Sequence, residues 1–247
     1  MEGIAGQVAV VVGAGAGIGR ATSALLAARG MTVACLDRDE RSARETAEAI
    51  GSSASAHGAD VTDADSVRAA FQAVADAYGQ VHAVVNCAGV QGPTGAPSHL
   101  VDLDAFDQAY AVNLRGALVV SQVAVSHMLP HRYGRIVHVA SIAGKEGNPN
   151  MIGYSATKAG MIGMVKAQGK EYARDGITVN ALAPAVIDTG FLTKLPDEVV
   201  RYMLDRIPMG RAGTVDDAAR LIAWVVSPEC GFTTGFTFDL SGGRATY

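Results

Sequence analysis

The sequence predicts an α/β protein whose parallel sheet of about seven strands is doubly wound, with helices on both faces. Three observations favour this fold class. Apolar runs alternate with helical segments, these runs are apolar throughout rather than at every second residue, and a glycine-rich turn joins the first run to the first helix. Strands are apolar at every position when helices cover both faces of their sheet.

The elements follow one another from strand to helix. The first strand, 8–12, leads through the glycine turn into a helix over 17–29 that ends at Gly30. Gly51, Gly79 and Pro130 end later helices. The other predicted strands are 32–36, 54–59, 81–85, 135–140, 177–182 and 234–240, and the other predicted helices are 39–50, 63–78, 102–129, 152–174 and 216–226.

Length, composition and charge indicate the number of domains and exclude some kinds of partner. The 247 residues are 49% hydrophobic, with no Pro/Ser-rich linker and no fixed repeat, so a single domain over 1–247 is expected. A net charge of −4 disfavours nucleic acid or an anionic membrane as partner. His127 and His131 are separated by Pro130 and lack an acidic or Cys partner at ligand spacing, so no metal site is predicted.

Cysteine usage and the N-terminus predict a cytoplasmic location. Cys35, Cys87 and Cys230 are odd in number and far apart, as expected for thiols in a reducing compartment. The N-terminus has no basic segment followed by an apolar core, and no apolar run reaches the ~18 residues of a membrane span.

Two predicted helical stretches, 117–125 and 159–167, lack a polar stripe. A helix of this kind is covered on more than one side, and the sheet covers only one. We therefore expect a homo-oligomer.

The turn after the first strand predicts a phosphate site. Gly13, Gly17 and Gly19 stand in the spacing Gly-x-x-x-Gly-x-Gly, with Ile18 inside the turn. Glycines permit close backbone approach, and the following helix offers free N–H groups to a pyrophosphate.

The end of the second strand indicates which dinucleotide binds. Asp37 lies where a carboxylate accepts from the ribose hydroxyls of the adenosine and repels the extra phosphate of NADP. Arg38 is the complication, because it is able to bind that phosphate. NAD is therefore favoured over NADP. Asp60 and Val61 close the third strand, where Asp60 either binds adenine or caps the strand end.

Tyr154 and Lys158 predict proton chemistry. Four residues apart on a helix, they share one face. A neighbouring ammonium favours the phenolate, so Lys158 is expected to lower the pKa of Tyr154. An exposed helix face is the alternative reading of this pair taken alone.

Six markers in order resemble the short-chain dehydrogenase/reductase family, which has a Rossmann-type sheet. They are the Gly-x-x-x-Gly-x-Gly turn, Asn86-Cys87-Ala88-Gly89, Asn113, Ser141, Tyr154-x-x-x-Lys158 and Pro184-Ala185-Val186-Ile187-Asp188-Thr189. The resemblance covers nearly the whole chain. Cys87 and Ala185 depart from the usual Asn-Asn-Ala-Gly and Pro-Gly motifs.

The resemblance implies a role for each marker. Tyr154 is the base that takes the alcohol proton, and Lys158 lowers its pKa and holds the nicotinamide ribose. Ser141 donates to the substrate oxygen, and Asn113 holds a water of the proton relay. Further cofactor contacts are expected from Asn86, Ala88, Gly89, Pro184, Ile187 and Thr189. By the same resemblance the oligomer is a tetramer.

The substrate side is less specific. Residues 188–207 form the expected lid, and the polar loop after Ser141 favours a hydrophilic substrate. Solvated loop residues are the alternative reading of its candidate contacts, which are Gln91, Glu146, Asn148 and Asn150. The stretches 141–149 and 233–247 resemble family members that oxidise 2-keto-3-deoxy sugar acids of the L-rhamnonate and L-fuconate type at C4. Lys145, Lys194 and Arg244 are the cations available to such an anion.

Two alternatives stay open. A 3-oxoacyl-thioester reductase of the same family is disfavoured by Asp37 and by Ala16, which places no cation in the glycine turn. A non-catalytic NAD-binding regulator would be free to lose the four residues of the catalytic set.

Overall fold

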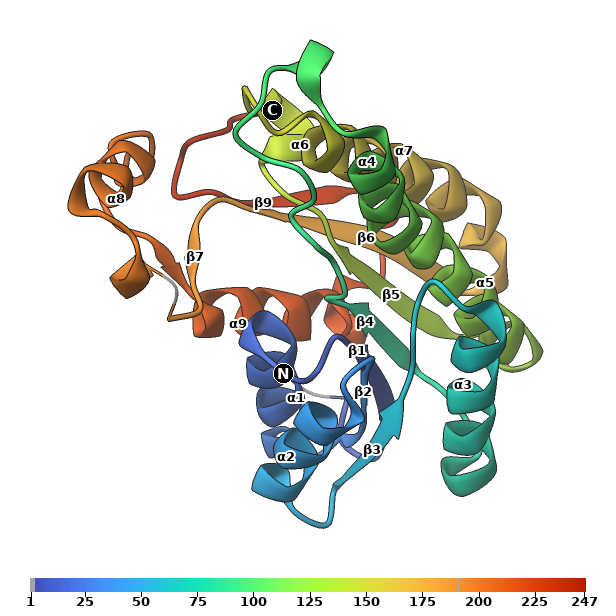
Figure 1. Cartoon of the computed structure of the whole chain (residues 1–247). Helices are drawn as coiled ribbons and strands as arrows, with labels where there is room; N and C mark the ends of the chain where they lie inside the picture. Colours follow the sequence, from blue (N-terminus) through green and yellow to red (C-terminus); the bar gives the residue numbers. More distant parts are fainter. Residues whose placement is uncertain (1–2, 191) are drawn as a thin grey trace.

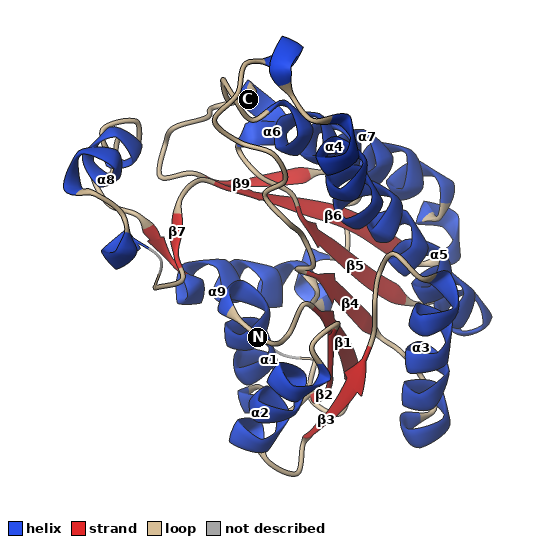
Figure 2. Ribbon diagram, viewed as in Figure 1, coloured by secondary structure: helices blue, strands red, loops and turns tan. Residues whose placement is uncertain are grey.

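The strand order places a binding site at the centre of the molecule. In the computed structural model, which describes residues 3–190 and 192–247, seven parallel strands form one sheet in the order β3-β2-β1-β4-β5-β6-β9 (Figures 1 and 2). The chain adds strands on one side of β1 and then returns to add the rest on the other side. Ligands of such sheets bind beyond the carboxyl ends of the strands at this reversal.

The helices and strands follow one another in the predicted order, with bounds close to the predicted ones. The strands of the main sheet are β1 Val8–Val12, β2 Thr32–Asp37, β3 Ala54–Gly58, β4 Ala83–Asn86, β5 Gly134–Val139, β6 Ile177–Pro184 and β9 Thr237–Leu240. The helices are α1 Gly17–Ala28, α2 Glu40–Ile50, α3 Ala64–Tyr78, α4 Leu103–Tyr110, α5 Gly116–Met128, α6 Ala143–Glu146, α7 Ile152–Glu171, α8 Asp197–Leu204 and α9 Val215–Val225. The prediction of a doubly wound α/β fold is confirmed.

Two apolar cores cover the two faces of the sheet. Alternate residues of β1 divide between them: Val8, Val10 and Val12 pack with α3, α5 and α7, whereas Ala9 and Val11 pack with α1, α2 and α9. Figure 1 shows the two helix layers on opposite sides of the strands. This double burial explains why the strands are apolar throughout.

Three features were not predicted. The short helix α6 follows Ser141, and β7 Ile187–Asp188 pairs in parallel with β8 Gly213–Thr214 outside the main sheet. The predicted long helix over 102–129 is present, but a π-helical turn, Ala111–Arg115, lies within it between α4 and α5. π-turns interrupt helices mostly at functional positions, and this one carries Asn113.

One premise of the oligomer prediction also needs correction. The apolar surface of α5 is mostly buried within the single chain, where α3, the sheet and the π-helical turn pack against it. Its composition therefore does not require a partner subunit. Among the described residues, no helix has both the length and the apolar composition of a membrane span.

Candidate active site

Glycine shapes the turn between β1 and α1. Gly13 and Gly17 have φ angles of +78° and +51°, in the region that favours glycine. A Cβ on Gly19 would collide with the carbonyl oxygen of Gly13. Ala16 provides no side-chain cap to α1, so the first N–H groups of the helix lack a side-chain acceptor. The turn is a cradle that accommodates a phosphate.

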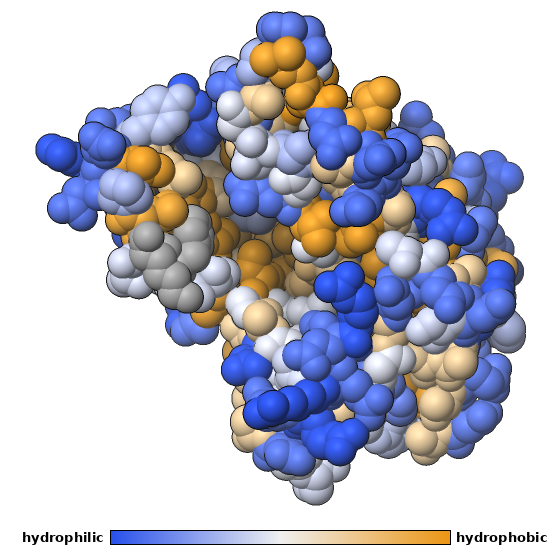
Figure 3. All heavy atoms as spheres, viewed as in Figure 1, coloured by the Kyte–Doolittle hydropathy of each residue, from blue (hydrophilic) through white to orange (hydrophobic). Residues whose placement is uncertain are grey.

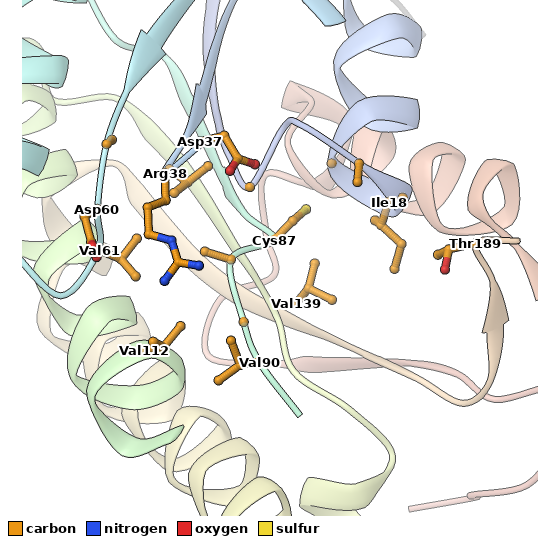
Figure 4. Close-up of a pocket in the computed structure, with 18 residues that line it drawn as sticks. Ile18, Asp37, Arg38, Asp60, Val61, Cys87, Val90, Val112, Val139 and Thr189 are labelled. Carbon is orange, nitrogen blue, oxygen red and sulfur yellow. The ribbon is translucent and has the colours of Figure 1, made fainter. Parts of the chain in front are cut away.

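This cradle lines a cavity of about 440 Å³ at the carboxyl ends of the strands (Figure 4). Most of the predicted cofactor residues line it, namely Gly13, Gly17, Ile18, Gly19, Asp37, Arg38, Asp60, Val61, Ala88, Gly89 and Thr189. Cys87, Val90 and Val139 complete the central wall without having been predicted. The residues present therefore fit a dinucleotide.

The carboxylate of Asp37 keeps accepting capacity in this cavity. Its Oδ2 accepts from Gly15 N at 2.9 Å and its Oδ1 from Asp39 N at 3.0 Å. A carboxylate offers about four lone-pair sites, so acceptors remain for ribose hydroxyls. Arg38 extends into the cavity beside Asp60 and Val61 (Figure 4). The structure thus brings together both groups on which the choice between NAD and NADP depends.

The carboxylate of Asp60 already accepts hydrogen bonds from within its own loop. Its Oδ1 accepts from Thr62 N at 2.9 Å and from Thr62 Oγ1 at 2.7 Å. These bonds hold the pKa of Asp60 below its ordinary value, with a smaller contribution from the charge of Arg38. The loop-capping role is therefore present, whether or not Asp60 also contacts adenine.

Asn86 shapes the wall from beneath rather than lining it. The residue is buried, and its Oδ1 accepts from Ala88 N at 3.1 Å. Its amide lies 3.2 Å from His138 Nδ1, and His138 Nε2 lies 2.8 Å from Ser121 Oγ. Burial lowers the pKa of His138 to about 3, so its ring is neutral. Sequence reasoning missed His138, because nothing near it in sequence marks its hydrogen bonds to Asn86 and Ser121.

Ser141, Tyr154 and Lys158 lie together in a second cavity of about 650 Å³. Ser141 follows β5, and the other two project from the first turns of α7. Six residues line both cavities, so the two are continuous: Ile18, Cys87, Gly89, Val90, Val139 and Thr189. Pro184 and Ile187, predicted as cofactor contacts, line the second cavity.

The predicted lowering of the Tyr154 pKa by Lys158 is wrong for the protein's own groups. Burial raises the pKa of Tyr154, and a hydrogen bond with Ser141 opposes this rise. Burial also lowers the pKa of Lys158 to about 8. Its ammonium donates to the Val139 carbonyl at 2.6 Å and lies 5.7 Å from the centroid of the Tyr154 ring. Loss of water around each group is the largest cause of both shifts.

Asn113 is held by protein groups on both sides. Its Oδ1 accepts from Val90 N and its Nδ2 donates to Val90 O, both at 2.8 Å, and Nδ2 also donates to Thr157 Oγ1 at 3.2 Å. The relay water expected at Asn113 stays a prediction. Asn113 fixes the backbone at Gly89–Val90, which lines both cavities.

The substrate predictions are met unevenly. Gln91, Asn148 and Asn150 line the second cavity. Glu146 instead pairs with Arg244, which does line it. Lys145 pairs with Asp239 at 3.2 Å and lines a separate groove. The side chain of Lys194 lies outside the described part. Three residues of the expected lid region also line the second cavity without having been predicted as substrate contacts, namely Tyr202, Met203 and Arg206.

Comparisons with known proteins agree with this geometry. Residues 13–245 match a family described as Enoyl-(Acyl carrier protein) reductase. The chain is 41% identical over 243 residues to 2-dehydro-3-deoxy-L-rhamnonate dehydrogenase (NAD(+)) of Sphingomonas sp. (strain SKA58), covering 98% of this chain and 97% of that one. This chain belongs to the short-chain dehydrogenase/reductase family, and the resemblance noted in the sequence is confirmed.

Other relatives indicate the range of the family. The chain is 36% identical over 243 residues to 3-oxoacyl-[acyl-carrier-protein] reductase FabG of Thermotoga maritima, covering 96% of this chain and 97% of that one. It matches a crystal structure of NAD+-bound xylitol dehydrogenase with a TM-score of 0.94 and 28% identity, covering 98% of this chain and 100% of that chain. The protein is therefore a short-chain oxidoreductase, and its substrate has to be argued from the second cavity.

Proposed function

We propose that this protein oxidises a secondary alcohol of a 2-keto-3-deoxy sugar acid to a ketone, with NAD as the hydride acceptor. The hydroxyl at C4 of 2-keto-3-deoxy-L-rhamnonate or 2-keto-3-deoxy-L-fuconate is the expected site. The observation that carries this proposal is one cavity in which Ser141, Tyr154 and Lys158 adjoin the glycine-built cradle. The resemblance to the rhamnonate enzyme of Sphingomonas supports the substrate class.

The catalytic groups divide the proton work. Tyr154 as phenolate takes the proton of the substrate hydroxyl, and the bound dinucleotide supplies the hydride acceptor. Ser141 Oγ accepts from Ala143 N at 3.1 Å, and its own hydrogen, which bonds to Tyr154 in the free protein, would turn to the reacting oxygen. Lys158, in the same cavity, would hold the nicotinamide ribose. Asn113 positions the Gly89–Val90 backbone on which both ligands would rest.

NAD rather than NADP is supported by Asp37 at the end of β2 and by the absence of a cation at Ala16. It also agrees with the relatives named for NAD(+) and NAD+. Arg38 in the same cavity is the residue through which some use of NADP would arise.

Two finer proposals concern the whole protein. We propose a cytoplasmic homotetramer of single-domain chains. Three free thiols support the compartment. Ala159, Gly163 and Ala167, exposed along α7, support an interface on that helix. A monomer seen by light scattering at micromolar concentration would count against the oligomer.

A substrate screen tests the proposed function and its rivals. NAD and NADP are each offered with sugar acids, polyols, simple secondary alcohols and 3-hydroxyacyl thioesters, while absorbance of the reduced nicotinamide is followed. We expect NAD to be reduced fastest with a 2-keto-3-deoxy sugar acid. Preference for acyl thioesters would favour the FabG-like reductase, to which this chain is also similar. Binding of NAD without turnover of any alcohol would favour the regulator.

A further inference from the structure

The charge of the second cavity identifies one end of its ligand. Among the described residues that line it, three are basic and none is acidic: Lys158, Arg206 and Arg244. Lys158 lies at the reacting end, where its ammonium donates to the Val139 carbonyl. The two arginines are therefore the candidates for an anionic group placed away from the reacting carbon.

Arg244 is already neutralised. Its Nε and Nη2 both donate to Glu146 Oε2, at 2.9 and 2.7 Å, and Nη2 also donates to Asn148 Oδ1 at 3.3 Å. Its side chain is only 9% exposed. A substrate carboxylate would have to displace Glu146 to gain the same donors, so Arg244 is a poor first contact.

Arg206 has the opposite character. It is exposed, and its guanidinium lies 4.4 Å from the centroid of the Tyr202 ring. Within the described residues, no carboxylate lies within ion-pairing distance of it. An arginine stacked on an aromatic face keeps its in-plane N–H donors for a carboxylate, which it binds through two parallel hydrogen bonds.

The backbone next to Arg206 is anchored although the side chain is exposed. Ile207 is 4% exposed, and Met209 N donates to Gly242 O at 3.1 Å. Arg206 thus joins the projecting helix α8 to the body, and the surface is hollowed between the two (Figure 3). Its backbone is held while α8 carries Tyr202 over the cavity.

From these contacts we infer that Arg206 binds the carboxylate of the substrate and, with Tyr202, sets the specificity for acids over neutral polyols. This inference rests on the proposed function, since it supplies the recognition of the acid group in that reaction. Arg206 could not be singled out from the sequence alone, because Lys145, Lys194 and Arg244 are also basic.

The test compares KM with kcat for 2-keto-3-deoxy-L-rhamnonate and NAD. Removing one charged hydrogen-bonding partner should raise KM about 10–100-fold in Arg206→Gln, with kcat within about threefold of the original. Arg206→Lys keeps the charge but loses the two-pronged geometry, so an intermediate KM is expected. Arg201→Gln, on the exposed surface of the neighbouring helix α8, is the matched control and should leave both constants unchanged. An Arg206→Gln enzyme with the KM of this control would overturn the inference while leaving the proposed function intact.

A second readout separates this inference from the proposed function. If the unaltered protein oxidises no sugar acid, the proposed function fails, and Arg206 is judged by binding of pyruvate to the NAD-loaded Tyr154→Phe protein. Calorimetry should then give a pyruvate affinity at least about tenfold weaker when Arg206→Gln is added. Equal pyruvate affinity with and without Arg206→Gln would overturn the carboxylate site. The midpoint of thermal unfolding checks that each variant folds.

Discussion

The two continuous cavities are built by different means. The cofactor cavity is formed by backbone at strand ends and by glycines whose missing side chains make the space. The substrate cavity is closed by side chains from segments far apart in sequence, such as Glu146 and Arg244, which are 98 residues apart. The first kind of site tolerates no added atom, whereas the second is adjusted by exchanging charges. Binding of a common cofactor and selection of a particular substrate are thereby separated within one fold.

The largest expected effect falls where the two cavities join. Tyr154→Phe removes the proton acceptor but keeps the ring, so the rate of oxidation should fall by about 10²–10⁴ while NAD binding is nearly unchanged. Steady-state rates and NAD titration measure the two quantities. A variant that keeps more than a tenth of the rate would remove Tyr154 from its role.

Next in size is an added methyl group in the cofactor cavity. In Gly19→Ala the new Cβ meets the Gly13 carbonyl oxygen, so overpacking should cost about 1–3 kcal/mol of folding free energy and weaken NAD binding at least about tenfold. Ala77→Ser, which adds one atom on the exposed surface of α3, is the control. It should change the free energy of unfolding by less than about 0.5 kcal/mol. Equal behaviour of the two variants would contradict a cavity defined by missing side chains.

Lys158 is expected to lower the free energy of unfolding, although the proposed reaction needs it. Its pKa falls from 10.5 to about 8 on burial, so between these pH values the unfolded chain binds more protons and folding stability rises with pH. Below about pH 8 the buried charge destabilises the fold. We expect Lys158→Met to raise the free energy of unfolding by about 1–3 kcal/mol at neutral pH, to remove this rise with pH and to abolish turnover. Denaturant titrations at several pH values measure the free energy of unfolding, with the exposed Lys166→Met as control. A less stable Lys158→Met protein would contradict the assignment.

The smallest effect is expected on the substrate side. Glu146→Gln weakens the hold on Arg244, and because the pair is partly exposed, KM for the sugar acid should change by only about two- to fivefold. NAD affinity should stay constant. The exposed Glu198→Gln is the matched control. A changed affinity for NAD in Glu146→Gln would break the separation between the two cavities.

The difference between the cofactor cavity and the substrate cavity also decides what could be predicted from the sequence. Strands 8–12 and 32–36 and the turn at Gly13, Gly17 and Gly19 were readable, because burial on two faces and close backbone approach leave local patterns. The π-helical turn at Asn113 was not, and the hydrogen bonds that Asn113 makes there join it to Val90, a residue distant in sequence. The raised pKa of Tyr154 depends on burial that no spacing expresses.

In the substrate cavity, patterns of neighbouring residues in the sequence predicted fewer of the contacts correctly. Glu146 was predicted to contact substrate, but its carboxylate is taken by Arg244 from the end of the chain. Arg206 went unnoticed because nothing near it in sequence marks an arginine that lacks a carboxylate partner. Long-range pairing of charges decides which side chains remain available, and that pairing follows from the fold.

We propose that hydride passes directly from C4 of a sugar acid to NAD at the junction of the two cavities. This transfer is followed with 2-keto-3-deoxy-L-rhamnonate deuterated at C4 and mass analysis of the reduced nicotinamide. We expect one deuterium in the reduced cofactor and a 4-keto product. Loss of the deuterium to water, or no reduction of NAD by this acid, would contradict this proposal.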